Sequence, residues 1–572
     1  ITEGGWAMIA IDGDGKWIKG FDQIHGAGYN GVAIAVDSKY FYAAHEGPLP
    51  DQDTKIKKGS KENPEFEYGI SLTRYVLDEQ KPVPYGRESF KWLNSYERLK
   101  KEQKQGLQGM VLLDGMLYIS SYYSKGILIV DAEKAEQKGL IPVEDPGVMV
   151  LSGKNILIQS GKNICSIDPK TQASTVVLKN ISAKGLFFDE AQGLLYVSNS
   201  DTNTVDVFKG AGKVRSIGVP GGAYQGKFIP ERMVNPVGLV VFKGKLWVTE
   251  NRVNPKRVLA WDLKSDKVAV QLFGNPPYGG SAAGFDHADI SSFVGLQGLW
   301  KIDLAAKTAE FASVFQKDAK HFGAYKWAYR YSFHHEAGRN FLVGSGFINT
   351  VSELMPDGSL KDLAAQSTVG SFRYGCDWNP PESFEKALEK HLKIVDPDGK
   401  NYKNFTNNLG VFWRDRNGDG LCQEDEFEFT GKDALLAGTR WGHMIDGITY
   451  RIPATVGGKD GFIVMKPDGF DKNGVPNYPT LEQAVAKAVT VSKTDSLGNF
   501  ASIRAESQTD RFGNLILNST PNMVAFSPEG KKLWFFKNEW VGVHGSHNAP
   551  LPVTGQMQGN LFFLGDAAID DK

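Results

Sequence analysis

The stretch GMVLLDGMLYISSYYSKGILIVD, from Gly109 to Asp131, carries the clearest strand signal in the chain. A glycine is followed by an apolar run, an Asp-Gly turn, a second run with an aromatic residue, a polar turn and a third run that ends in aspartate. Each run has about five residues, the usual length of a β-strand, and glycine with aspartate marks the turns. The stretch therefore predicts three antiparallel strands of one small sheet.

The same pattern recurs at intervals of roughly 40 residues, which is the period of a β-propeller blade. Clear copies begin at Gly31, Gly147, Gly185 and Gly238, and looser copies begin at Trp327 and Thr509. One small antiparallel sheet cannot bury both faces, whereas a ring of such sheets packs face to face around a channel. We therefore predict an all-β protein, a single β-propeller over residues 1–572 with seven blades, or eight as the alternative. An unclosed series of β-sandwich domains fits this regular spacing less well.

The composition is that of a globular protein with balanced charge. The 572 residues include 65 Lys and Arg against 66 Asp and Glu, which gives a formal net charge of −1. This balance excludes a broadly basic nucleic-acid binder and gives no reason to expect an anionic membrane as a partner. No uninterrupted apolar run approaches the roughly 20 residues that a membrane-spanning helix needs.

Cysteine is scarce, with only Cys165, Cys376 and Cys422. Their odd number and wide spacing exclude a disulfide scaffold, a cysteine-rich zinc site and covalently attached haem. The sequence begins with Ile1 rather than methionine. We therefore expect a trimmed mature chain or a fragment, and either is compatible with an export signal that has been lost.

Three segments depart from the strand pattern. Residues 380–435 are predicted to be an insertion that begins with a helix, because apolar residues recur every four positions from Phe384. Residues 476–492 are predicted to be a helical excursion, because Thr480 is followed by glutamine at capping-box spacing. A third helix is expected in the charged segment 88–105.

The two ends are predicted to complete one blade. Residues 1–21 fit two outer strands and residues 559–572 fit the inner strands, so their pairing would close the ring. Alternatively, both ends are cuts through a longer protein.

The segment DRNGDGLCQEDE, from Asp415 to Glu426, is the sharpest motif. It has the spacing of an EF-hand-type calcium loop, with oxygen-bearing side chains at the first, third and fifth positions, glycine at the sixth and glutamate at the last. The predicted Ca²⁺ ligands are Asp415, Asn417, Asp419, Leu421 through its carbonyl, Gln423 through a water, and Glu426. A strand-like segment precedes it, so we expect a lone loop in which Ca²⁺ has a structural role. The alternative is an acidic turn, because Asn-Gly and Asp-Gly favour hairpins.

Histidine is scarce, with ten residues, and several lie where we expect blade ends. Blade ends gather at the mouth of a propeller channel, where residues distant in sequence can meet. The candidate catalytic residues are His544, His547, His334, His335, His443, Tyr122 and Arg252. In this interpretation a histidine is the general base, an arginine stabilises charge and a tyrosine is the acid. The alternative is that each histidine is a hydrogen-bonded loop or core residue.

Four segments carry a resemblance to a known family: GGWAMIAIDGDG, NPKRVLAWD, FGNPPYGGS and HGSHNAPLP. With the blade repeats, they resemble the NHL-type propellers of secreted bacterial proteins, which are sometimes joined to a FlgD-like immunoglobulin domain. The resemblance implies an exported protein. It does not select among the streptogramin-type lyases, lactonases, quinoprotein dehydrogenases and binding modules of related propellers.

The sequence thus predicts a secreted or periplasmic, calcium-binding β-propeller. We expect a polar small-molecule or carbohydrate ligand at the channel mouth, because tryptophan and tyrosine offer stacking platforms for sugars. A polysaccharide lyase or hydrolase is the expected enzyme class, if the protein is catalytic. The first alternative is a noncatalytic interaction subunit with a protein partner in an extracellular or periplasmic complex. The second is a quinone-cofactor dehydrogenase.

Overall fold

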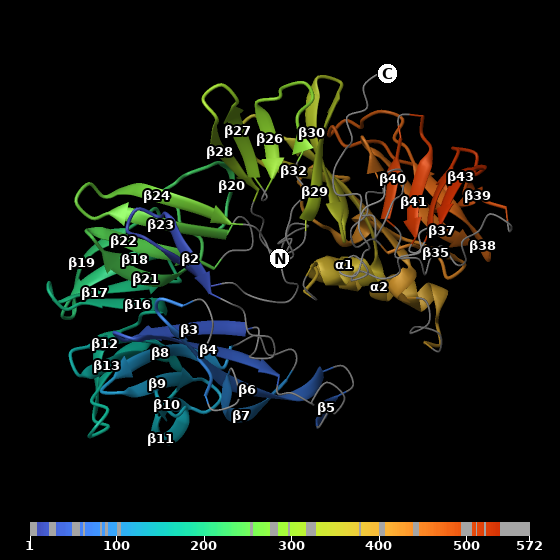
Figure 1. The fold of residues 1–572 in the computed structure, drawn as a ribbon. Helices are drawn as coiled ribbons and strands as arrows, with labels where there is room; N and C mark the ends of the chain where they lie inside the picture. The colour runs from blue at the N-terminus through green and yellow to red at the C-terminus, as the bar shows by residue number, and fades with distance from the viewer. Residues whose placement is uncertain are drawn as a thin grey trace. The chain divides into compact units, whose positions relative to one another are not determined.

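The fold is described from a computed structural model, in which contacts divide the chain into two compact units. Unit 1 comprises Ile1–Gly222, Ile229–Arg252 and Lys256–Gly274, and unit 2 comprises Ala223–Phe228, Val253–Pro255 and Asn275–Lys572. The structure describes residues 8–21, 30–48, 58–60, 63–79, 83–85, 90–99, 105–251, 256–274, 284–295, 298–315, 328–376, 379–399, 406–438, 445–492, 506–510, 512–519 and 522–537. Both units consist mainly of antiparallel β-sheets (Figure 1).

Unit 1 contains five sheets and one hairpin among its described residues (Figure 1). The hairpin is β1 (Met8–Ile11) with β2 (Trp17–Phe21). The first sheet has β3 (Asn30–Val36), β4 (Tyr40–Pro48), β5 (Lys58–Ser60), β6 (Asn63–Val76) and β7 (Lys91–Leu99). The second has β8 (Leu107–Leu113), β9 (Met116–Ser121), β10 (Gly126–Asp131) and β11 (Glu136–Pro142), and the third has β12 (Pro146–Ser152), β13 (Asn155–Ser160), β14 (Asn163–Ile167) and β15 (Ser174–Lys179). The fourth has β16 (Ala183–Asp189), β17 (Leu194–Asn199), β18 (Thr204–Lys209) and β19 (Gly212–Ile217), and the fifth has β21 (Pro236–Phe242), β22 (Lys245–Glu250), β23 (Lys256–Asp262) and β24 (Lys267–Gly274).

The first strands of consecutive sheets pack against each other in unit 1, from β3 through β8, β12 and β16 to β21. Glycine permits this approach at two of the contacts. A Cβ on Gly185 would lie 1.5 Å from the carbonyl oxygen of Val237, and one on Gly109 would lie 3.2 Å from the backbone nitrogen of Met149. Four-stranded meanders whose first strands adjoin are the blades of a β-propeller, so unit 1 supports the predicted β-propeller fold, and a single propeller over the whole chain stays a prediction. The number of blades stays a prediction.

Apolar side chains fill the space between consecutive sheets. Between the second and third sheets the buried residues are Val111, Tyr118, Ile127, Met149, Ile156, Ile158 and Cys165. Each large side chain buried in this way contributes about 1.5–3 kcal/mol to stability. Hydroxyl groups add links, because Ser120 Oγ donates to the carbonyl of Gly147 at 2.7 Å and Ser198 Oγ donates to that of Val237 at 3.1 Å.

The aspartate that ends the third strand of several repeats orders the turn that follows. Oδ1 of Asp131 accepts hydrogen bonds from two backbone N–H groups, those of Glu133 and Lys134, both at 3.0 Å. Asp168 and Asp262 make the same pair of bonds with the second and third residues after them. These backbone donors lower the pKa of all three carboxyl groups. The repeated aspartate is therefore a turn signal.

The N-terminal hairpin contacts both the first and the fifth sheets of unit 1. The ring of Phe21 lies 5.2 Å from that of Phe41 and 5.5 Å from that of Tyr75. On the other side, Lys245 Nζ donates to the carbonyl of Gly13 at 3.0 Å. The predicted partner of this hairpin, residues 559–572, lies outside the described residues.

Unit 2 has four sheets among its described residues (Figure 1). The first has β20 (Gln225–Lys227), β25 (Gly284–Phe285), β26 (Ser292–Gly295), β27 (Gly298–Asp303) and β28 (Thr308–Phe315). The second has β29 (Ala328–Glu336), β30 (Arg339–Gly346), β31 (Asn349–Leu354), β32 (Leu360–Thr368), β33 (Gly410–Arg414) and β34 (Phe427–Phe429). The third has β35 (Ala434–Leu436), β36 (Ile445–Asp446), β37 (Thr449–Val456), β38 (Lys459–Met465) and β39 (Val489–Thr490), and the fourth has β40 (Glu506–Thr509), β41 (Leu515–Ser519), β42 (Asn522–Phe526) and β43 (Lys532–Lys537). The helices are α1 (Val369–Gly375), α2 (Glu382–Val395), η2 (Thr406–Asn408), η3 (Glu424–Glu426) and α4 (Leu481–Ala486).

Helices α1 and α2 pack together at one end of the six-stranded sheet of unit 2. The ring of Phe384 in α2 stacks on that of Phe372 in α1 at 4.3 Å, and it meets that of Phe427 in β34 at 5.5 Å. Arg373 and Glu385 join the two helices through bonds of 2.8 and 2.6 Å. These contacts fix α2 against β34.

Two of the three segments predicted to depart from the strand pattern contain an α-helix. Helix α2 begins at Glu382, and α4 begins after Thr480, whose hydroxyl accepts from the N–H of Gln483 at 3.2 Å. However, β33 and β34 lie inside the predicted insertion 380–435 and extend the sheet. The helix predicted in residues 88–105 is wrong: β7 forms there because it pairs along β6, and its Tyr96 stacks on another tyrosine.

We expect Gly185→Ala to destabilise unit 1, because the added Cβ has no room beside the carbonyl of Val237. Forced contacts of this kind cost about 1–3 kcal/mol. The control is Gly212→Ala, where the closest atom to a Cβ is the carbonyl oxygen of Lys209 at 3.6 Å. Denaturant unfolding of the two variants checks the prediction, and equal losses of unfolding free energy would contradict it.

Candidate functional site

The segment from Asp415 to Glu426 forms a loop in unit 2 that joins β33 to β34. These strands pair Trp413 with Phe427, so the sheet holds both ends of the loop. The N–H of Asp415 also donates to the carbonyl of Leu363 at 3.0 Å, which connects the loop to β32. The position of the predicted calcium loop is therefore set by the six-stranded sheet.

The Asp415 carboxylate organises the first half of the loop. Oδ1 accepts hydrogen bonds from the N–H of Gly418 at 2.7 Å and of Asp419 at 3.0 Å, and Oδ2 accepts from the N–H of Gly420 at 2.9 Å. Gly418 and Gly420 have φ angles of 81° and 72°, a region that strains other residues. The side chain of Asp415 is fully buried as a result of this turn.

The next predicted ligands, Asn417 and Asp419, lie on the exposed side of the loop. Asn417 Oδ1 accepts from the N–H of Asp419 at 2.9 Å, and Asp419 Oδ1 accepts from the N–H of Leu421 at 2.8 Å. Asp419 Oδ2 accepts from Nε2 of Gln423 at 2.7 Å. With the bond from Asp419 N–H to Asp415 and the one from Gln423 N–H to Glu426, all six predicted ligand residues are joined to another member of the set by hydrogen bonds.

Glu426 closes the loop and is 2% exposed. Its Oε1 accepts from the N–H of Arg416 at 2.8 Å. Its Oε2 accepts from the indole N–H of Trp413 at 3.0 Å and from the N–H of Gln423 at 3.1 Å. The last ligand position therefore reaches back to the start of the loop, as the motif requires.

The residue types of the loop fit Ca²⁺. Burial raises the pKa of the Asp415 and Glu426 carboxyl groups, and the charge of Asp415 raises that of Glu426 further. Lys390 pairs with Glu424 and Arg416 pairs with Glu428, whereas Lys361 acts on Asp415 through its charge and offsets part of this rise. A cation held by these oxygens would relieve the repulsion, and oxygen ligands are those that Ca²⁺ prefers. Within the described ranges, no group of three or more Asp, Glu, His or Cys side chains is already arranged around a metal position.

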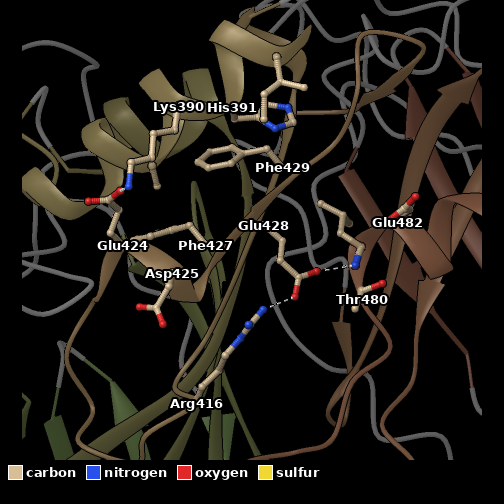
Figure 2. Close-up of a pocket in the computed structure, with 13 residues that line it drawn as sticks. Lys390, His391, Arg416, Glu424, Asp425, Phe427, Glu428, Phe429, Thr480 and Glu482 are labelled. Atoms are coloured by element: carbon tan, nitrogen blue, oxygen red, sulfur yellow. Dashed lines mark hydrogen bonds and ion pairs between the residues drawn. The ribbon is translucent and has the colours of Figure 1, made fainter.

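A pocket of about 720 Å³ lies beside this loop, between α2, the segment of η3 with β34, and the start of α4 (Figure 2). Its charged lining residues are Lys390, Arg416, Glu424, Asp425, Glu428 and Glu482. Three of them belong to the loop itself. The volume is within the range of small-molecule sites.

Polar contacts connect the walls of the pocket (Figure 2). Lys390 of α2 forms an ion pair with Glu424 of the loop. Arg416 Nη2 donates to Glu428 Oε1 at 2.8 Å, and the N–H of Leu481 in α4 donates to Glu428 Oε2 at 2.6 Å. The loop is therefore tied to both helices.

An aromatic layer forms part of the pocket lining. The ring of Phe429 lies 5.2 Å from that of His391 at an interplanar angle of 28°. Nε2 of His391 donates to the carbonyl of Thr430 at 2.9 Å, and burial lowers the pKa of this ring. The pocket thus combines flat, neutral rings with charged groups.

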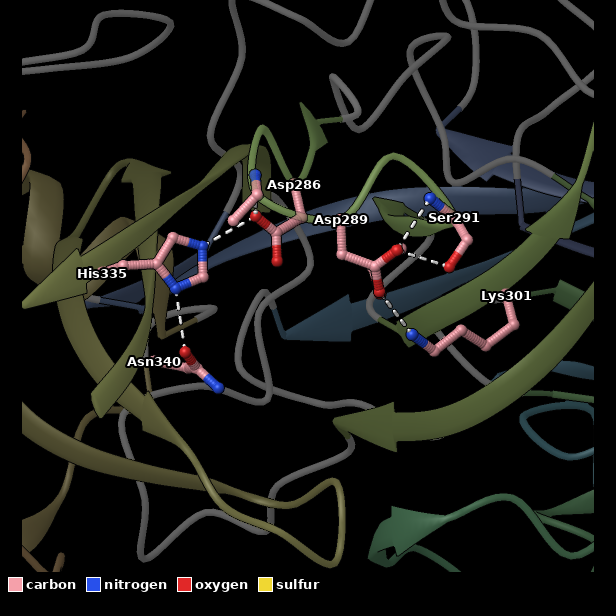
Figure 3. Close-up of polar contacts among 8 residues, drawn as sticks. Asp286, Asp289, Ser291, Lys301, His335 and Asn340 are labelled. Atoms are coloured by element: carbon pink, nitrogen blue, oxygen red, sulfur yellow. Dashed lines mark hydrogen bonds and ion pairs between the residues drawn. The ribbon is translucent and has the colours of Figure 1, made fainter. Parts of the chain in front are cut away.

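A second polar group in unit 2 surrounds His335 on β29 (Figure 3). Its Nε2 lies 2.7 Å from Oδ1 of Asp286, and its Nδ1 lies 2.8 Å from Oδ1 of Asn340. Asp286 raises the pKa of His335. Both ring nitrogens are engaged, and the raised pKa favours the protonated ring, which does not act as a general base.

Of the other predicted catalytic residues, the structure describes His334 and Tyr122. His334 points to the opposite face of its strand, where Nε2 lies 2.9 Å from Oε2 of Glu336. Tyr122 belongs to unit 1, where its ring packs against Tyr123 at 5.2 Å. The remaining candidates lie outside the described residues: Arg252, His443, His544 and His547. The proposed catalytic group stays a prediction.

The pocket was not predicted from the sequence. Lys390, Asp425 and Glu482 come from three elements, and nothing in their spacing connects them. Asp286 was not predicted either, because it is 49 residues away from its partner His335. The capping signal at Thr480 located one wall, α4, without indicating a site.

Comparisons with known proteins leave the family open. No protein-family model matches the chain, and no curated protein matches it. Among solved structures, a chain of a nidogen/laminin complex is 14% identical with a TM-score of 0.33, over 47% of this chain and 90% of that one. The luciferin-regenerating enzyme is 12% identical with a TM-score of 0.29, over 50% and 92%. The dihydro-haem d1 dehydrogenase NirN is 12% identical with a TM-score of 0.28, over 62% and 69%.

Similarity at these scores carries no argument about this chain, so the β-propeller architecture rests on the packing of its own sheets. None of the described helices has the length and apolar character needed to cross a membrane.

The raised pKa values of Asp415 and Glu426 predict how the metal-free loop responds to pH. Burial disfavours their charged forms, so the folded state binds protons more tightly than the unfolded state does. In chelator, stability should therefore fall as the pH rises above the ordinary values of 3.8 and 4.5. Asp415→Asn removes one of these titrations. The unfolding free energy of the variant minus that of the wild type should therefore increase from acidic to neutral pH. If this difference stays constant or decreases, the prediction is wrong.

Proposed function

We propose that this chain is an exported, calcium-binding β-propeller protein that binds a carbohydrate in the pocket built against its calcium loop. One observation carries the proposal: residues 415–426 both have the ligand spacing for Ca²⁺ and supply a wall of the pocket. The relation to NHL-type propellers of secreted proteins is part of the same proposal.

Calcium binding is supported by the two buried acids, Asp415 and Glu426. Each is surrounded by N–H donors, and neither forms an ion pair among the described residues. When bound, Ca²⁺ supplies positive charge that neutralises this pair. Single loops of this kind in extracellular modules bind with dissociation constants of roughly 10⁻⁴–10⁻³ M, which suits the calcium concentration outside cells.

Carbohydrate binding is supported by the mixed lining of the pocket. Sugars have an apolar ring face and a polar rim, and the pocket offers Phe429 and His391 beside charged groups. The exposed Ile394, with 79% of its surface accessible, adds an apolar edge. We therefore assign the ligand to this pocket of unit 2, and a ligand at a channel mouth stays a prediction from the sequence.

A binding role is favoured over the lyase or hydrolase reaction. Of the predicted histidines in the described ranges, His335 is held by Asp286 and Asn340, and His334 is bonded to Glu336. Both rings already have partners that a substrate would need to displace.

Calcium should stabilise the wild-type protein, by about 2.7 kcal/mol when its concentration is 100 times the dissociation constant. The variant Asp415→Asn with Glu426→Gln keeps the size of both side chains and should lose this gain while it remains folded in chelator. Thermal unfolding with calcium and with chelator measures the effect.

The control is Asp357→Asn, which changes an aspartate of an ordinary turn whose Oδ1 accepts from the N–H of Ser359 at 2.9 Å. This variant should keep the full response to calcium. Equal stability of the wild type with and without calcium would show that the loop holds no ion.

A further inference from the structure

The indole of Trp413 contacts the last acid of the calcium loop. Its N–H donates to Oε2 of Glu426 at 3.0 Å. Two backbone groups also donate to this carboxylate, the N–H of Arg416 to Oε1 at 2.8 Å and that of Gln423 to Oε2 at 3.1 Å. Both oxygens of Glu426 are therefore held, and among its described contacts Trp413 supplies the side-chain donor.

The six-stranded sheet fixes the position of Trp413. This residue is fully buried, and it pairs with Ala365 on one neighbouring strand and with Phe427 on the other. Apolar side chains of α1 and α2 belong to the same core cluster. Glu426 directly precedes Phe427, so the register of the strands brings the indole and the carboxylate together. The donor therefore cannot turn away unless the core opens.

We propose that Trp413 makes the loop selective for Ca²⁺ over Mg²⁺, by holding the Glu426 carboxylate so that it can offer both oxygens to the ion. This inference deepens the calcium part of the proposed function and rests on it. Trp413 is a positioning residue in this role, because it contacts a predicted ligand and not the ion. Hydrogen-bond partners of this kind orient metal ligands and tune the affinity of the site.

The two ions differ in what they require of a carboxylate. Ca²⁺ takes roughly six to eight oxygens at about 2.3–2.6 Å and accepts both oxygens of one carboxylate. Mg²⁺ requires octahedral geometry at about 2.0–2.1 Å and usually keeps several waters. To offer one oxygen at the shorter distance, the carboxylate of Glu426 would have to rotate, and N–H donors on both oxygens resist that rotation.

A purely structural role for the bond from Trp413 predicts a different result. A buried carboxylate needs hydrogen-bond donors whether or not an ion is present. Loss of the indole N–H would then lower the stability in chelator and weaken the binding of both ions alike. The ratio of the two affinities, rather than the stability, separates the two roles.

The test is titration calorimetry of the full chain with Ca²⁺ and, separately, with Mg²⁺. The wild type should bind Ca²⁺ more tightly. Trp413→Phe removes the indole donor, and it should weaken Ca²⁺ binding by about tenfold, which is within the range for losing a hydrogen-bond partner of a metal ligand. It should change Mg²⁺ binding by less than about threefold, because Mg²⁺ does not need both oxygens.

The matched control is Trp261→Phe, which removes the same atoms from a tryptophan of unit 1. Trp261 is also buried, and its Nε1 has no hydrogen-bond partner. This variant should keep both dissociation constants of the wild type. Because Trp413→Phe also leaves a cavity, a second variant carries 3-benzothienylalanine at position 413, which keeps the shape of the indole and replaces its N–H by sulfur. It should lower the affinity ratio as Trp413→Phe does.

Three results would overturn the inference and leave the calcium site in place. They are equal affinity of the wild type for the two ions, a ratio that the benzothienylalanine variant leaves unchanged, and equal weakening of both ions, which would assign the bond a structural role. Failure of the wild type to bind either ion would instead remove the calcium proposal and this inference together.

Discussion

The contact between the first strands of neighbouring sheets determines the spacing in unit 1. At Gly185 the carbonyl oxygen of the next sheet occupies the place of a side chain, so the two backbones approach more closely than any other residue would permit. Apolar layers such as that of Ile156 and Ile158 fill the wider space away from this line. Serine hydroxyls bridge the sheets only because the approach is close. A larger residue at the glycine would disturb all three kinds of contact together.

Unit 2 is also built of antiparallel sheets, and there one sheet holds the loop 415–426 in position. Two further strands, β33 and β34, lengthen one sheet to six strands, and the loop between them places two carboxylates in the interior. Burying acids is costly unless donors or a cation face them. Backbone N–H groups around Asp415 and Glu426 offset part of this cost, and the remaining repulsion is what makes the loop suited to a divalent ion.

Local signals predicted the parts of the structure that depend on neighbouring residues. The glycine and aspartate of each repeat marked the strands correctly, because Asp131 and its equivalents order their turns through bonds to residues two and three positions away. The helix expected at residues 88–105 was wrong, since pairing with a distant strand decided its conformation. The loop 415–426 was found from its spacing, whereas the pocket beside it was not. Its walls are joined by contacts such as that of Leu481 with Glu428, which are 53 residues apart.

The short strand β20 belongs to one unit but lies, in the sequence, between two segments of the other. Residues Ala223–Phe228 belong to unit 2, although the segments before and after them belong to unit 1. Within unit 2, β20 covers the outer edge of β28, and the side chain of Gln225 accepts a hydrogen bond from the N–H of Leu360 at 3.1 Å. No single cut therefore separates the units cleanly. A fragment that starts at residue 275 would leave the edge of β28 bare, and open edges of this kind invite aggregation.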